Sequence, residues 1–403
     1  MKNNLLNKFT SQLKKEFTKK ETFTGSVLKE FQFKIADAPA IIEKRYKDWI
    51  YWGEDNLYPL SLDEYTNGSA IHGSILKTKI KMMHGDGFLW NGAKTKEESD
   101  AAYAALAPNV KAELDFLLKN KFGGMSLIEV TKKLSKDYQR RGQMCYEIVF
   151  NTDFTKIVTV KYVDAKNIRA GKTEDGIVKT YYYHNDWTQQ GKGGFKPKEI
   201  PAYYEGNKES YNQLVFIKTG DLDYYGEPSY KDALYWIATD VQMGIFHNAN
   251  MNNGMNPGLH FNFFKLPDSQ NQEDEIIAGI EKTWGGAKNT GKKVVTFSDG
   301  KENAMEIKPI EVSNLDKQLL LVAELCDKKI LSGHQLTSPL LAGISVSGQL
   351  GGNTELQTAY EIFDKVSMEA DRQTLSDSLQ MILDYNKIPV TIDINPFNPF
   401  ING

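Results

Sequence analysis

Cysteine is scarce in this sequence, and neither a long apolar run nor a basic excess is present. The 403 residues include only Cys145 and Cys326, far apart and each without a second cysteine at metal-ligand spacing. Two thiols cannot build a disulfide framework, which favours a reducing compartment such as a cytoplasm. The lysine-rich start, residues 1–20, is followed by no signal-peptide core, and no apolar stretch is long enough to span a membrane.

The net charge of −3 and the pI of about 6.2 argue against a general nucleic-acid binder, which normally carries a basic excess. Hydrophobic residues make up 40% of the chain and aromatic residues 11%, enough to bury sizeable cores. A chain of this length exceeds one ordinary core, so we expect several domains.

Catalytic motifs are missing as well. Gly286–Lys293 approaches a phosphate-binding loop, but Lys293 replaces the serine or threonine that would hold Mg²⁺, and the segment follows a predicted helix rather than a strand. The six histidines show no paired ligand spacing, and no Gly-x-Ser-x-Gly is present. We therefore expect no catalytic residue, no metal and no cofactor, and a chain that is not an enzyme.

Periodicity predicts an α+β chain in which a β-rich region lies between helical segments. The expected helices span residues 65–84, 108–120, 126–142, 230–252, 271–284, 313–332 and 355–385. The expected strands span residues 144–151, 156–162, 176–184, 214–218, 259–264, 293–297, 305–310 and 388–394. The four elements from 259 to 310 predict a small βαββ unit inserted between two long helices, and Asp371 and Arg372 interrupt the apolar stripe of the last helix.

The most informative segment is uncharged. Residues 335–354 contain no Lys, Arg, Asp or Glu, although a quarter of the chain is charged, and they include four glycines. Such a segment suits a pliable loop that touches a charged partner without holding it, although an ordinary surface loop has the same composition.

The order of these parts resembles the portal proteins of tailed bacteriophages. The resemblance covers about residues 224–386 and rests on Tyr225-Gly-Glu-Pro-Ser229 opening a helix, Asn253-Gly-Met-Asn-Pro-Gly258 before a strand, and Thr337-Ser-Pro-Leu-Leu341 before Gly-Gly-Asn353-Thr-Glu355. Two features depart from the family: Ser229 follows Pro228, the reverse of the family's order, and only eighteen residues follow Tyr385, so the C-terminal crown should be short or absent.

The resemblance implies a portal-type fold and a ring of about twelve subunits around a DNA channel. Its parts would be a wing at 1–222, stem helices at 223–252 and 313–334, a clip at 253–312, and the tunnel loop, long wing helix and C-terminal strand at 335–403. The DNA-facing loop residues would be Leu341, Ile344, Ser345, Val346, Ser347, Gln349, Leu350 and Asn353. The adaptor-contacting clip residues would be Lys288, Asn289, Lys292 and Lys301.

The implied partners are further copies of the chain, double-stranded DNA, the large terminase ATPase, the major capsid protein and a head-tail adaptor, with no membrane. The implied location is the portal vertex of a virion assembled in the host cytoplasm. Two other readings stay open. Clustered carboxylates at Asp221 and Asp223, or at 273–275, would suit a metal-dependent nuclease, and a chain that stays single would suit a monomeric adaptor.

Overall fold

The computed structural model describes residues 42–119, 121, 124–174, 176–252, 259–284, 293–298, 300, 315–343 and 353–400. The chain divides into two compact units. The larger unit comprises Ala36–Gly244 and Asp316–Gly403, and the smaller comprises Met1–Ile35 and Ile245–Leu315. Helices and mainly antiparallel strands in separate segments fit the α+β class that the sequence predicted.

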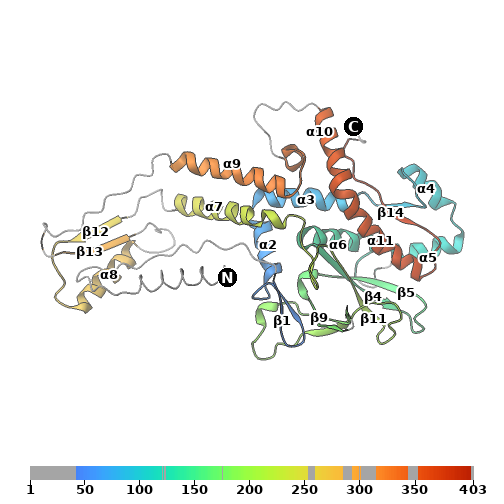
Figure 1. Ribbon diagram of the computed structural model, residues 1–403, viewed down its shortest axis with the longest axis horizontal. Coiled ribbons are helices and arrows are strands. Elements are labelled where there is room, and N and C mark those ends of the chain that lie inside the picture. The colour runs from blue at the N-terminus through green and yellow to red at the C-terminus, as the bar shows by residue number, and fades with distance from the viewer. Residues whose placement is uncertain are drawn as a thin grey trace, which may run out of the picture. The chain divides into compact units, whose positions relative to one another are not determined.

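A three-stranded antiparallel sheet, in the order β11-β4-β5, organises the larger unit (Figure 1). Its strands are β4 (Gln143–Phe150), β5 (Ile157–Val163) and β11 (Asn212–Lys218). Because successive side chains of a strand point to opposite faces, Met144 and Tyr146 enter one hydrophobic core while Cys145 enters the other. Three of the four strands predicted between 144 and 218 are thereby confirmed.

The first core lies between this sheet and helices α5 (Pro108–Lys119), α6 (Leu127–Arg141) and α11 (Glu369–Tyr385). Helix α6 begins with a capping box, in which Ser126 and Glu129 satisfy each other's backbone N–H groups, and ends at Gly142 in the left-handed conformation. Helix α4 (Lys96–Ala104), which the sequence analysis did not predict, packs beside β3 (Phe88–Trp90). Strand β14 (Ile392–Ile394) pairs antiparallel with β3.

Two predicted elements are each divided in two. The helix expected at 65–84 is two helices, α2 (Tyr58–Gly68) and α3 (Ala70–His84), because Ser69 leaves helical geometry and its hydroxyl caps α3 by accepting the N–H of His72. The strand expected at 176–184 divides at Lys179, where the chain leaves one antiparallel pair and enters a second sheet. The elements are β7 (Thr173–Glu174) with β8 (Ile177–Val178), and β6 (Ile168–Ala170), β9 (Thr180–Tyr183) and β10 (Lys198–Pro201).

The second core lies on the opposite face of the central sheet, where the aromatic side chains of Trp52, Tyr58 and Tyr225 are buried. Trp52, on β2 (Ile50–Trp52), stacks on Tyr225 with ring centroids 4.8 Å apart. Strand β2 pairs with β1 (Glu43–Arg45), whose Glu43 carboxylate accepts the N–H groups of Asp223, Tyr224 and Tyr225. The turn before the next long helix is therefore held by hydrogen bonds from its backbone N–H groups to one carboxylate.

The predicted long helices after this turn are present. A short 3₁₀ turn, η3 (Lys231–Ala233), leads into α7 (Leu234–Asn252), and α9 (Leu315–Gly333) follows later in the chain. Cys326 and Ile330 on α9 are buried in the same core as Leu234 and Ile237 on α7. Cys326 is thus a core thiol.

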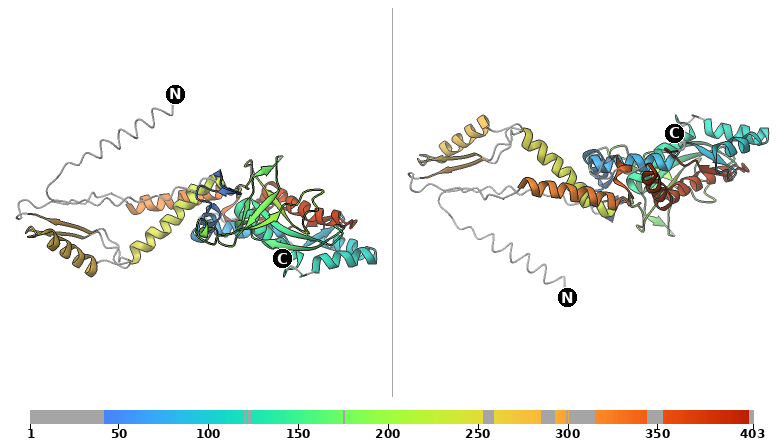
Figure 2. Two further views of the ribbon diagram at one scale, coloured as in Figure 1. Left: turned by 90° about the horizontal axis from the view of Figure 1, so that it is seen from below. Right: turned by 90° about the horizontal axis from the view of Figure 1, so that it is seen from above.

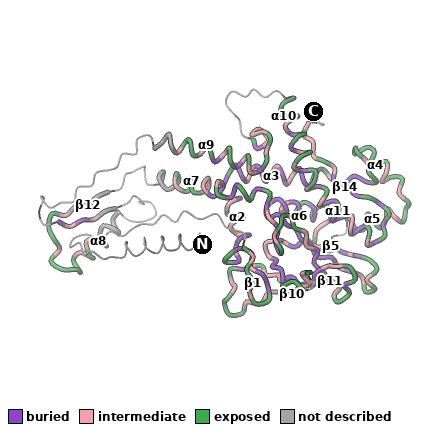
Figure 3. Tube along the Cα trace, viewed as in Figure 1, coloured by how far each residue is buried: buried purple, intermediate pink, exposed green. Residues whose placement is uncertain are grey.

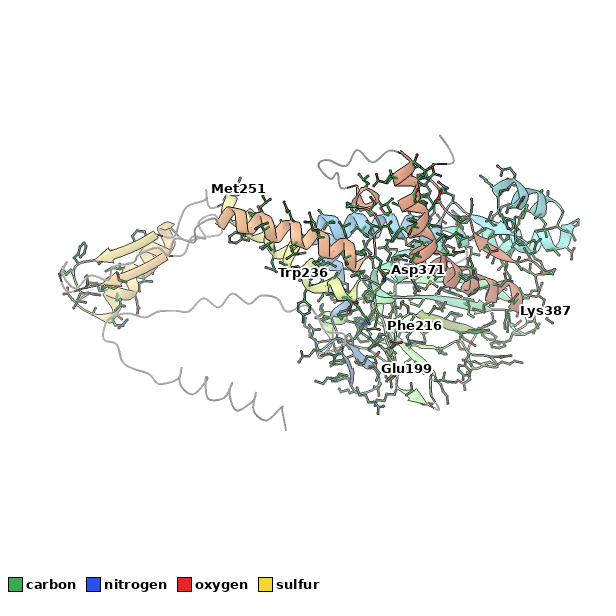
Figure 4. The ribbon with its side chains drawn as sticks, turned by 45° about the horizontal axis from the view of Figure 1, so that its top comes forward. Glu199, Phe216, Trp236, Met251, Asp371 and Lys387 are labelled. Carbon is green, nitrogen blue, oxygen red and sulfur yellow. The ribbon has the colours of Figure 1, made fainter. Side chains whose placement is uncertain are left out.

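The helix expected at 355–385 contains a break. Helix α10 (Asn353–Phe363) passes through a π-helical segment (Asp364–Met368) into α11. The interruption that the sequence placed at Asp371 and Arg372 therefore lies just before them. Figure 4 labels Asp371 on α11, in the body of the larger unit.

In the smaller unit, β12 (Leu259–Phe263) and β13 (Lys293–Phe297) form a parallel pair, and α8 (Gln270–Trp284) connects them and lies beside them (Figure 2). A parallel pair requires such a crossover connection, and Phe263 stacks on Phe297 at 5.3 Å. The strand expected at 305–310 lies outside the described residues.

Candidate functional site

The N-terminal part of the uncharged segment and the π-helical turn that follows α10 are both attached to α3, which makes this anchor the candidate functional site. On the N-terminal side, α9 ends where Gly333 packs directly against η3. A Cβ added to Gly333 would lie 2.3 Å from the Cβ of Ala233. The chain then turns through Gln335 at φ 56°, and the N–H of Leu336 donates to the carbonyl of Leu331. A helix end closed in this way fixes where the segment begins.

Two buried histidines join this turn to α3. Nδ1 of His72 and Nε2 of His334 are 2.8 Å apart, and the Tyr230 ring lies 4.5 Å from the first imidazole and 5.0 Å from the second. Burial, with Arg140 and Lys79 nearby, lowers the pKa of His72 to about 3. Burial and the neighbouring His72 hold the pKa of His334 well below its usual range. The two rings are therefore neutral, and one donates its N–H to the other.

The next residues lie along α3. A 3₁₀ turn, η5 (Pro339–Ala342), is capped by Ser338, whose hydroxyl accepts the N–H of Leu340. The hydroxyl of Ser74 donates to the carbonyl of Ala342 at 2.8 Å, and that of Thr78 donates to the carbonyl of Leu341 at 3.3 Å. These anchors use side-chain hydroxyls and backbone carbonyls, so they need no charge.

The helix that follows the uncharged segment is held against α3 at its π-helical turn. The guanidinium of Arg372 bonds both oxygens of Asp364, at 2.6 and 2.7 Å, across the π turn, and also donates to the carbonyl of Met82 on α3. Bidentate pairs of this kind fix orientation as well as distance. The hydroxyl of Thr337 donates to the carbonyl of Ala359 at 2.7 Å, which links the segment to α10 directly.

The same stretch of α3 also binds the turn that precedes helix α7. The ammonium group of Lys79 is buried and donates to the hydroxyl of Ser229 at 2.7 Å. Burial lowers the pKa of Lys79, and burial raises the pKa of Asp371, whose carboxylate accepts an N–H of Gln139 at 2.6 Å. Helix α3 thus contacts the N-terminal part of the uncharged segment, the helix that follows the segment, and the turn that opens α7.

The predicted DNA-facing residues are divided by this geometry. Leu341 lies in η5, half-buried and packed against the first core, and Asn353 begins α10. Ile344, Ser345, Val346, Ser347, Gln349 and Leu350 lie outside the described residues, as do Lys288, Asn289, Lys292 and Lys301 of the expected clip. The DNA-facing and adaptor-contacting roles therefore stay predictions.

The pairing of His72 with His334 was not predicted from the sequence. The pair is separated by 262 positions, and no motif or spacing reports such a contact. Lys79 and Asp371 were missed as anchor residues for the same reason. Asp371 carried the one usable signal, a charge interrupting an apolar stripe.

Metal binding and membrane crossing find no support among the described residues. In that part of the chain no cluster of three or more His, Cys, Asp or Glu could hold a metal ion, and no helix is long and apolar enough to cross a membrane. Burial raises the pKa of Cys145 well above its usual range, so that thiol is a poor nucleophile. Its Sγ instead donates to the carbonyl of Val163.

The fold of this chain is similar to that of chains in solved particle structures. One chain in the neck of an empty gene transfer agent (GTA) particle, computed with C6 symmetry, matches with a TM-score of 0.53 at 15% identity, covering 83% of each chain. The chain has the fold of a particle-neck protein. A chain in the virion of the native GTA particle matches at 0.52 and 14% identity, over 84% of this chain and 83% of that one. A chain in the neck of the native particle, computed with C12 symmetry, matches at 0.52 and 13% identity, over 83% of each chain.

The resemblance to connectors of phage-type particles is thereby confirmed for the fold. No protein-family model matches the chain, and no curated protein does.

Proposed function

We propose that this protein is a portal: a structural subunit of a ring at one vertex of a virion, through which double-stranded DNA passes during packaging and ejection. The observation that carries the proposal is an uncharged segment whose N-terminal part is anchored to α3, in a fold shared with particle-neck chains. One of those necks was computed with C12 symmetry, which supports a ring of about twelve copies.

The charge distribution around the expected loop suits a conduit. Duplex DNA carries dense negative charge, and each contact with Lys or Arg adds affinity through counterion release. Residues 343–354 contain no Lys or Arg, and the exposed charged residues of α10, Glu355 and Glu361, are acidic. A surface of this kind lets a polyanion pass without retaining it.

The remaining parts follow from the family resemblance. Residues 1–222 would form the wing, α7 and α9 the stem, and 253–312 the clip that contacts a head-tail adaptor. The large terminase ATPase would dock on the ring and supply the energy of packaging, and the major capsid protein would surround it. The portal chain would then be no enzyme, and purified protein should leave DNA intact in Mg²⁺ or Mn²⁺.

The test adds positive charge at the proposed tunnel loop. We expect Gln349→Lys/Asn353→Lys to leave ring formation unchanged but to slow DNA packaging, because about twelve copies add about two dozen cations around the channel. The slowing should weaken as salt is raised, since screening shortens the reach of each charge. Purified variant rings should also retain short duplex DNA that wild-type rings release.

The matched control is Ala101→Lys/Asn109→Lys, which adds the same two charges at exposed positions of α4 and α5. Packaging by the control should equal that of the wild type. Equal packaging rates for the loop variant and the wild type at every salt concentration would refute the placement of the loop in the channel.

A further inference from the structure

Helix α9 carries exposed leucines together with charges of opposite sign on two of its flanks. Its buried stripe follows Cys326 and Ile330, whereas most of its other described positions are exposed or half-buried (Figure 3). Leu320 is 62% exposed, Leu321 63% and Leu325 41%, so three leucines lie outside the buried stripe. Exposed apolar residues gathered on one helix mark a contact surface more often than isolated ones do.

One flank is acidic. Leu320, Glu324 and Asp327 recur at spacings of four and three residues and therefore share one side of the helix. Asp240 of α7 faces the same flank. Burial and the nearby Asp240 and Glu324 raise the pKa of Asp327, which places three carboxylates together. Within the part of the chain that the structure describes, none of these three carboxylates has an ion-pair partner.

The next flank is basic. Leu321, Leu325 and Lys328 form the same pattern shifted by one residue, which turns it by roughly 100° around the helix. Lys329 lies beside them. Both lysines are exposed and, among the described residues, neither forms an ion pair. The helix dipole favours cations near a C-terminal end, but it explains neither the exposed leucines nor the cluster of three carboxylates.

We infer that α9 is the polar seam of a head-to-tail contact between copies of this chain, in which the acidic flank of one copy receives the basic flank of the next. Complementary flanks also fit a two-fold contact, in which each flank meets its opposite on the partner, but only the head-to-tail arrangement closes a ring. The inference rests on the proposed ring and names the surface that closes it. Leucines on both flanks supply apolar contact area, and the charges set register and direction.

Charge reversal tests the seam. Glu324→Lys/Asp327→Lys makes both flanks basic, and Lys328→Glu/Lys329→Glu makes both acidic. Each double variant should need at least roughly tenfold more protein to form rings than the wild type, because attraction becomes repulsion at every interface. Native mass measurement and negative-stain images report the assembly state, and thermal unfolding of the dissociated chains verifies that each variant is folded.

Two rescues separate the seam from a general loss of stability. Mixing the two double variants should restore rings, since a copy with two basic flanks fits beside a copy with two acidic flanks. Combining all four substitutions in one chain should restore them as well, with the polarity exchanged. Lys132→Glu/Lys133→Glu is the matched control, because it reverses two adjacent exposed lysines on α6 and should assemble like the wild type.

The outcomes distinguish the two proposals. A wild-type chain that stays single under all assembly conditions overturns both the portal and the seam. Wild-type rings with double variants that assemble equally well, or variants that neither mixing nor the fourfold exchange rescues, overturn the seam alone.

Discussion

The buried pair of His72 and His334 makes the stability of the larger unit depend on pH in a way that can be calculated. Both side chains are neutral in the folded protein, because burial lowers the pKa of His72 to about 3 and that of His334 well below its usual value. In the unfolded chain a histidine titrates near pH 6.5. The unfolded state therefore binds more protons as the pH falls below 6.5, and the free energy of unfolding decreases.

At pH 5.5 this difference amounts to about 1.4 kcal/mol for each histidine, and at pH 7.5 to less than about 0.1 kcal/mol. The contribution is thus fully present above pH 6.5 and is lost progressively towards pH 3. Asp371 and Asp137 act in the opposite direction, because burial raises the pKa of each, to about 6 for Asp137, so that their folded forms bind protons first. The net pH profile of the wild type is a sum, and a variant is needed to isolate the histidines.

The perturbation is His72→Gln/His334→Gln, which keeps polar groups at both positions and removes the titration. Urea unfolding followed by near-ultraviolet circular dichroism at pH 7.5, 6.5 and 5.5 gives the free energy of unfolding at each pH. Between pH 7.5 and 5.5 the wild type should lose about 2 to 3 kcal/mol more than the double variant. His247→Gln, at an exposed position on α7, should retain the wild-type profile. Equal slopes for the wild type and the double variant would refute the neutral buried pair.

Two further substitutions test the packing of the larger unit by urea unfolding. Gly142→Ala should lower the free energy of unfolding by more than about 2 kcal/mol, because the residue has φ 69° and a Cβ would lie 2.1 Å from the carbonyl oxygen of Glu227. The control is Gly191→Ala, at φ 83° with open space around it, which measures the backbone strain alone. Arg141→Gln should lower the free energy of unfolding by about 3 kcal/mol at pH 7.5, since it leaves the buried Asp137 without its ion pair at 3.0 Å. The loss should be smaller at pH 5.5, where that carboxyl takes up a proton. A loss that does not depend on pH would contradict the ion-pair account.

Local signals predicted most elements of the larger unit, and the failures have physical reasons. Helix α6 was predictable because its capping box, apolar stripe and Gly142 all lie within one short window. The break at Ser69 was missed because the apolar period continues across it, although a serine before a new helical run is an N-cap signal. The π-helical segment is accompanied by the bidentate contact of Arg372 with Asp364, which joins the first residue of the segment to a residue of α11 and which no local pattern reports.

The α9 seam illustrates a signal that was available but unused. One apolar stripe of this helix runs through Leu319, Val322, Cys326 and Ile330. The run Leu319-Leu-Leu-Val322 contains more apolar residues than one stripe can bury, since consecutive positions on a helix point in different directions. In the structure Leu320 and Leu321 are indeed more than half exposed. Excess apolar positions of this kind predict a contact surface even before a structure exists.

Packing along α3 explains part of the uncharged composition from which the function was inferred. From the sequence, residues 335–354 formed one uncharged loop. In the structure residues 336–342 lie along α3 and, apart from Thr337, are half-buried or buried. A charge there would need a buried partner, so packing alone accounts for its absence. A DNA-facing surface is therefore proposed from the uncharged composition of residues 343–354 rather than from that of residues 336–342. This is why the decisive substitutions lie at Gln349 and Asn353 rather than at Leu341, where a lysine would disturb the anchor and a slower packaging rate would report misfolding instead of phosphate attraction.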